Sequence, residues 1–175
     1  RPAWAYTASG TADLDPRVRE YAALETALAG QIARTSPDPQ ADAVAAGESW
    51  GRELSAGFPV RGAAAARHSV VELLGDLGFE PAANARASTV RLRCCPLLEA
   101  ARARPDIVCP VHLGLVRGVL SELGGEPEDA VLTPFSEPGA CRLDLPATAD
   151  APRQQSAPPP TSAPSPSTHL GASLP

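Results

Sequence analysis

The chain has 175 residues, which is enough for one domain with a hydrophobic core, and its formal net charge is −5. All 15 basic residues are arginine, and the acidic excess argues against a chain that binds DNA through a basic surface of its own. No apolar run is long enough to cross a membrane and no signal peptide is visible, so we expect no membrane partner and a cytoplasmic location. Because methionine is absent, we expect a fragment of a longer protein.

The first predicted elements are a strand and a long helix. Residues 1–8 alternate in character and contain two aromatic side chains, which is typical of a strand. Asp15-Pro16 then has the pattern of a helix start, since aspartate caps helix N-termini and proline fits the first turn. The predicted helix covers 15–34 and carries one apolar stripe, formed by Leu14, Val18, Tyr21, Leu24, Leu28 and Ile32.

Two more helices are predicted before the middle of the chain. An Ala-rich helix covers 40–56, and a third helix covers 62–77 with Gly78 at the position of a C-terminal cap. The third helix has a clear buried face, which consists of Val70, Val71, Leu74 and Leu77.

The second half of the chain mixes strands and short helices. A strand edge and turn are predicted over 79–87, strands over 88–94, 130–135 and 140–145, and helices over 96–104 and 110–123. In the second strand Val90 and Leu92 should face inward, with arginines outward. The expected fold class is therefore α+β, with a small mixed helix and sheet region. Residues 146–175 are mainly Pro, Ser, Ala and Thr with few large apolar side chains, which predicts disorder.

Three cysteines and one histidine form the candidate site. Cys95 and Cys109 are each followed by proline, so both are predicted to cap a helix, where the helix dipole would favour a thiolate. Two helix starts could converge beside the strand that contains Cys141. His112 follows Cys109 by three residues and could face the same point. Thiolates bind soft metals and iron–sulfur clusters, so these four residues are the candidate metal ligands.

Other interpretations of the same residues stay open. The spacing of the cysteines matches no short metal signature, so all of them could be buried structural residues. Cys94 should point away from Cys95 if both lie in a strand, and is not expected to be a ligand. His68 is predicted to be structural or solvated, and His169 inert. No phosphate-binding loop, nucleophile elbow or other catalytic motif is present, so no enzymatic activity is expected.

A family resemblance enters at residues 93–145. Cys95-Pro96, then Val108-Cys109-Pro110-Val111-His112, then Pro134 and Pro138-Gly139-Ala140-Cys141 resemble the C-terminal domain of ArsR-like winged-helix regulators of high-GC bacteria. The Suf-operon repressors, which sense iron–sulfur clusters, belong to the same broad group. Residues 1–8 also resemble the end of a wing hairpin, and the helix at 15–34 resembles the dimerisation helix that follows it.

The resemblance implies a regulator whose DNA-reading helices lie upstream of Arg1. Cys95, Cys109 and Cys141 match the family positions that ligate a cluster. Many relatives have a doubled cysteine where this chain has Ala140-Cys141, which leaves His112 as the best fourth ligand. The implied cofactor is an iron–sulfur cluster, with zinc as the alternative. The implied partners are a second copy of the chain, and DNA through the upstream domain rather than through this fragment.

These expectations divide the chain into four parts. They are the end of a wing at 1–8, a helical linker and dimerisation segment at 13–56, a sensor domain at 57–145 and a disordered tail at 146–175. The expected function is effector sensing and dimerisation in a transcriptional regulator. Two alternatives stay open: a regulator domain that binds a small apolar ligand with structural cysteines, and a structural zinc module that mediates protein contacts.

Overall fold

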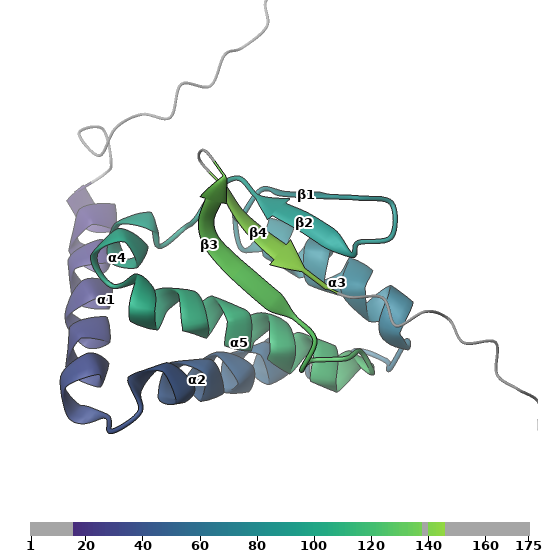
Figure 1. Ribbon diagram of the computed structural model, residues 1–175, viewed down its shortest axis with the longest axis horizontal. Coiled ribbons are helices and arrows are strands. Elements are labelled where there is room, and N and C mark those ends of the chain that lie inside the picture. The colour runs from purple at the N-terminus through teal and green to yellow at the C-terminus, as the bar shows by residue number, and fades with distance from the viewer. Residues whose placement is uncertain (1–15, 138–139, 146–175) are drawn as a thin grey trace, which may run out of the picture.

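The structure is a computed structural model that describes residues 16–137 and 140–145, with side chains described from Ala23 onward. These residues form five helices and one four-stranded antiparallel sheet (Figure 1). The predicted α+β class is therefore confirmed. The strand expected at 1–8, the tail expected at 146–175 and the side chains of Leu14, Val18 and Tyr21 lie outside the described residues.

The helices and strands fall close to their predicted places. In chain order they are α1 (Pro16–Thr35), α2 (Pro39–Ser55), α3 (Ala63–Asp76), β1 (Pro81–Ala83), β2 (Thr89–Leu92), α4 (Leu98–Ala103), α5 (Pro105–Leu123), β3 (Val131–Glu137) and β4 (Ala140–Asp144). The largest difference concerns α5, which begins five residues before the predicted start at Pro110. Pro105 takes the first-turn position of this helix, and Pro110 lies inside it.

The sheet has the strand order β1-β2-β4-β3, so β3 and β1 are its edges. On β2, Val90 and Leu92 are buried while Arg91 between them is exposed, which confirms the predicted alternation. These two side chains join a hydrophobic core with apolar residues of α3 and of the C-terminal half of α5. Helix α5 ends at Gly124, which adopts the left-handed backbone conformation typical of glycine at a helix C-terminus.

Helices α2 and α5 lie side by side (Figure 1) and form the most extensive contact between any two elements of the described chain. Four glycines make this possible. A Cβ atom on Gly47 would overlap the backbone carbonyl of Val111, and one on Gly114 would overlap that of Val44. Gly51 and Gly118 are equally crowded. Gly114 and Gly118 are four residues apart on α5 and so present one glycine face to the backbone of α2.

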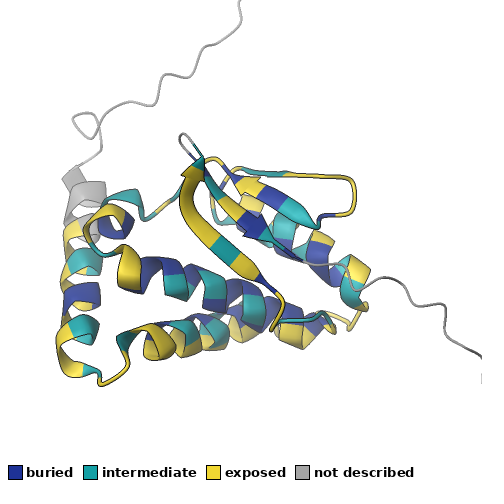
Figure 2. Cartoon of the chain, viewed as in Figure 1, coloured by how far each residue is buried: buried dark blue, intermediate teal, exposed yellow. Residues whose placement is uncertain are grey.

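A second apolar cluster lies at the other end of α5. It joins Ala29 of α1, Ala43 of α2 and Ala100 of α4 with Ile107 and Cys109 of α5. Helix α1 stands across the ends of α2 and α5 and packs against α4 (Figure 1). Its outer side is exposed (Figure 2), where Leu24 and Leu28 are 55% and 57% accessible.

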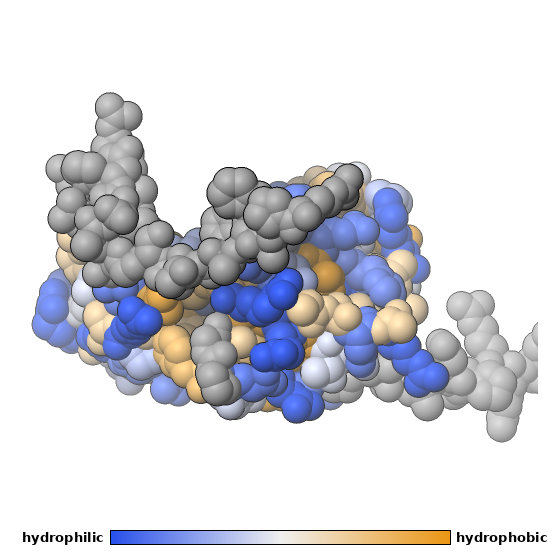
Figure 3. Space-filling model, turned by 90° about the horizontal axis from the view of Figure 1, so that it is seen from above, coloured by the Kyte–Doolittle hydropathy of each residue, from blue (hydrophilic) through white to orange (hydrophobic). Residues whose placement is uncertain are grey.

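The surface is mixed in character. Viewed from above, hydrophilic and hydrophobic areas are interspersed where the described residues are visible (Figure 3). Within residues 16–137 and 140–145, no helix is long and apolar enough to span a membrane.

Candidate functional site

The candidate ligands come from three segments that are far apart in sequence. Cys95 lies in the turn before α4, Cys109 and His112 lie on α5, and Cys141 lies on β4. All four line one internal cavity, together with apolar side chains that include Phe79, Leu92, Ala101, Leu132 and Phe135. The structure therefore brings together the residues that the sequence singled out. Sequence analysis did not identify the apolar residues as part of this site.

The predicted helix-cap positions of the cysteines are wrong. Helix α4 begins at Leu98, three residues after Cys95, and α5 begins at Pro105, so Cys109 lies more than one turn inside the helix. The Cys-Pro pattern was read as a helix start because proline fits there, yet Pro110 is accommodated within the helix. Neither sulfur therefore owes its position to a helix N-terminus.

The protonation state of the thiols also differs from expectation. Burial is the main cause that raises the pKa of Cys95 to about 12, although a backbone hydrogen bond from Leu97 opposes it. Burial, followed by the proximity of Cys141 and Asp106, raises the pKa of Cys109 to about 11. Both residues are thiols rather than thiolates at neutral pH, because a charged sulfur would be poorly solvated here. A nearby cation would reverse that preference.

His112 is a buried imidazole, with only 6% of its surface exposed. Its ring contacts the ring of Phe79 edge to face, with the centroids 4.9 Å apart. Burial lowers the pKa of His112 to about 4, so the ring is neutral at physiological pH. Its Nε2 atom has no hydrogen-bond partner among the described residues. A neutral, buried and unpartnered imidazole nitrogen is costly to leave unsatisfied and is the form that ligates metals.

A bulge in the edge strand shapes the side of the cavity at Cys141. The β3–β4 register shifts between Thr133 and Glu137, and Phe135 adopts a positive φ of 49° there. Such a conformation is uncommon for a bulky residue and marks a constrained backbone. It directs the Phe135 backbone N–H toward the Sγ atom of Cys141, at 3.4 Å. Sequence analysis missed this donor. The one signal of the bulge in the sequence is Pro134, because proline within a predicted strand is typical of an edge strand or a bulge.

Cys94 lies on the rim of the same cavity but is exposed. The reason given for excluding it was wrong, because β2 ends at Leu92 and neither Cys94 nor Cys95 is in a strand. Its backbone N–H donates to the carbonyl of Phe79. His68 is exposed on α3, as expected for a solvated residue, and His169 lies outside the described residues.

Three sulfurs and one imidazole form a donor set suited to a soft metal. The unpartnered Nε2 of His112 and the shared cavity both fit such a group. Among the described residues, no three of these side chains are placed so that they could hold an ion together without moving. The cavity has a volume of only about 10 Å³, at the lower limit for one water molecule. A single ion therefore needs small side-chain movements, whereas a cluster needs the surrounding elements to separate.

Comparison of the chain with family models, curated proteins and solved structures gives no match. The resemblance to ArsR-like regulators therefore stays a prediction that rests on the Cys-Pro, Val-Cys-Pro-Val-His and Pro-Gly-Ala-Cys segments.

Proposed function

We propose that this chain is the effector-sensing and dimerisation region of a DNA-binding transcriptional regulator and catalyses no reaction. Its effector would be a metal centre held by Cys95, Cys109 and Cys141, with His112 as the fourth ligand. The observation that carries the proposal is that these four donors, from three separate segments, line one buried cavity. The link to transcription is supported by the family resemblance, in which the three cysteines occupy the ligand positions.

The chemistry of the site supports a positively charged occupant. Sulfur and imidazole nitrogen are the ligands preferred by zinc and by iron–sulfur centres. When bound, such a centre supplies positive charge that stabilises thiolates. Cys95 and Cys109, which burial now keeps protonated, would release their protons on binding. His112 needs no deprotonation, because it is already neutral.

The path from this site to a dimer interface is short. Cys95 immediately precedes α4, and α4 packs against α1. Ile32 and Ala33 of α1 contact the same apolar cluster that contains Cys109 and borders Cys95. Occupation of the site would draw Cys95 toward α5 and β4 and so shift α4 under α1. If α1 pairs with its copy in a dimer, the spacing of two upstream winged helices would change.

The decisive experiment measures metal in single Cys→Ser variants. The wild-type chain and the four variants are purified without oxygen, and iron, sulfide and zinc are determined per chain. Metal ligands act as a unit, so Cys95→Ser, Cys109→Ser and Cys141→Ser should each lose most of the metal. Iron with sulfide would identify a cluster, and zinc alone a single-ion site.

Cys94→Ser is the matched control, because Cys94 neighbours Cys95 but is exposed. This variant should keep its metal. Thermal unfolding of each variant separates loss of ligation from loss of fold. A wild-type chain that stays free of metal after reconstitution contradicts the proposal, as does a Cys94→Ser variant that loses as much metal as Cys95→Ser.

A further inference from the structure

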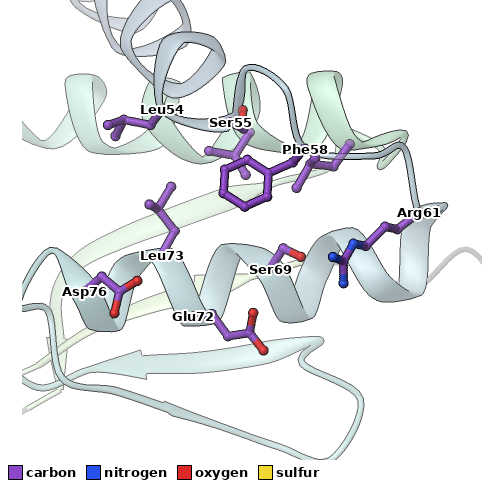
Figure 4. Close-up of a pocket in the computed structure, with 10 residues that line it drawn as sticks. Leu54, Ser55, Phe58, Arg61, Ser69, Glu72, Leu73 and Asp76 are labelled. Atoms are coloured by element: carbon purple, nitrogen blue, oxygen red, sulfur yellow. The ribbon is translucent and has the colours of Figure 1, made fainter.

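A second cavity lies at the opposite end of α5, between the C-terminal end of α2, the loop after it and α3 (Figure 4). Its volume is about 120 Å³, comparable to cavities that accept a benzene-sized molecule. The cavity exists because α2 and α3 both pack against α5 but not extensively against each other. Its apolar wall is formed by Leu54, Leu73, Val119 and Leu123.

The loop over this cavity places an aromatic ring beside it. Phe58 lines the cavity, yet 59% of its surface is exposed. The loop is held at both ends, because the Phe58 backbone N–H donates to Ser55 and that of Arg61 donates to Leu123. Gly57 and Gly62, both at positive φ, allow the two sharp changes of direction. A fixed loop thus keeps an uncovered aromatic face at the cavity.

The polar groups at the cavity carry a net negative charge. Ser69, Glu72 and Asp76 lie on the face of α3 that borders the cavity, and Arg61 lies on the loop side (Figure 4). Within the part of the chain that the structure describes, Glu72, Asp76 and Arg61 form no ion pair and the Ser69 hydroxyl makes no hydrogen bond. Two carboxylates against one guanidinium favour a cationic partner.

We propose that this cavity binds a small apolar molecule that carries an ammonium group. The apolar part would pack against Leu73 and Val119, in the way that ligand sites combine an apolar wall with a few convergent polar groups. The ammonium would lie between Glu72 and Asp76, and the exposed ring of Phe58 at the cavity would be available for a cation–π contact. The site is separate from the cysteine cavity and does not rest on the proposed function.

The test uses the whole chain, isotope-labelled for amide chemical-shift titration, with isopentylamine as the probe. The neutral isopentanol and the anionic 4-methylpentanoate share its apolar body but lack the positive charge. Saturable shifts should appear for residues at this cavity with the amine. The alcohol should bind about fivefold more weakly, the ratio expected for a solvent-accessible charge contact, and the carboxylate should not bind.

A charge-removing variant locates the ammonium. Glu72→Gln combined with Asp76→Asn should reduce amine affinity to that of the alcohol while leaving alcohol affinity unchanged. Glu128→Gln with Asp129→Asn removes the same charge from exposed positions outside the cavity and should bind the amine like the wild type. Both pairs of residues are exposed, so neither variant should unfold the chain. Equal affinity for amine and alcohol, equal loss in both variants, or no saturable shift would overturn the proposal.

Discussion

At the scale of single residues, His112 combines burial with an unpartnered ring nitrogen. It is buried without a partner for Nε2, and its pKa is lowered to about 4 by burial alone. Sequence analysis could place it three residues after Cys109, but the local pattern contains no signal for burial against Phe79. That contact depends on the β1–β2 region folding back over α5, which is a property of the tertiary structure.

The pKa of His112 predicts how stability depends on pH in the metal-free chain. Unfolded histidine titrates near 6.5 and folded His112 near 4, so between these values the unfolded chain binds one proton more. The contribution of neutral His112 to the free energy of unfolding is fully present above pH 6.5 and is lost as pH falls toward 4. At 1.36 kcal/mol per unit it amounts to roughly 3 kcal/mol.

Urea unfolding of chelator-treated protein across this pH range measures the effect. His112→Gln should remove this part of the pH dependence, whatever its stability at neutral pH. His68→Gln, at an exposed position, should retain the wild-type slope. Equal slopes in the wild type and His112→Gln would show that another group is responsible.

At the scale of elements, the pairing of α2 with α5 is the most constrained feature. At four glycines, backbone atoms of the facing helix occupy the space that a Cβ atom would need. The two backbones therefore approach more closely than helices with larger residues at these positions could. The Gly114/Gly118 spacing was visible in the sequence. Gly47 and Gly51 have the same spacing but lie in a weak Ala-rich pattern, and the identity of the partner helix could not be read from one helix alone.

We expect Gly114→Ala to destabilise the chain by at least about 2 kcal/mol, because its Cβ would overlap the backbone of Val44 and backbone cannot move aside cheaply. Gly75→Ala is the matched control on α3, where the nearest atoms are 3.9 Å away. It should be neutral or stabilise the chain by up to about 1 kcal/mol through helix propensity. Chemical denaturation measures the free energy of unfolding of the two variants. Similar free energies of unfolding for Gly114→Ala and Gly75→Ala would contradict the glycine-contact argument.

The helices and strands themselves were largely predictable, because apolar periodicity and caps act locally. Val90 and Leu92 needed only the alternation of one strand. The start of α5 was missed because Pro110 was taken as a first-turn residue, while the first-turn proline is Pro105. Cys95, Cys109 and Cys141 line one cavity as expected, but not through the helix starts that the Cys-Pro pattern suggested. The bulge at Phe135 arises from sheet pairing, for which Pro134 was the one local signal.

At the scale of the whole molecule, α1 is the element through which a second copy would be joined. Leu24 and Leu28 are more than half exposed and lie on a helix whose other side packs against α4. The dimer itself is part of the proposed function. Since these leucines contribute little to the core of a single chain, their replacement tests association separately from folding.

Leu24→Glu with Leu28→Glu should convert a dimer to a folded monomer, because a dimer interface would bury the new charges without partners. Sedimentation velocity measures the change and circular dichroism confirms the fold. Ala45→Glu with Ala46→Glu adds the same charge at exposed positions on α2 and should remain dimeric. A folded α1 variant that is still a dimer would place the interface elsewhere.

The 175-residue chain alone should not recognise DNA, since its net charge is −5. A gel-shift assay against the regulator's own promoter should show no complex at physiological salt. The same chain extended by the expected upstream winged helix should shift that DNA. Tight, sequence-dependent binding by the 175-residue chain alone would contradict the proposed domain arrangement.

The glycine-lined contact between α2 and α5 should also determine which helices can open locally while the rest of the chain stays folded. Helices locked backbone to backbone cannot separate by small steps, so their amides should exchange with deuterium only when the whole chain unfolds. Helix α1, with an exposed outer side and few neighbours, should open on its own and exchange far sooner. Two exchange regimes within one chain would then show that the α2–α5 pair is rigid and that α1 opens separately. The proposed link from the cysteine site through α4 to a dimer interface on α1 requires such a difference.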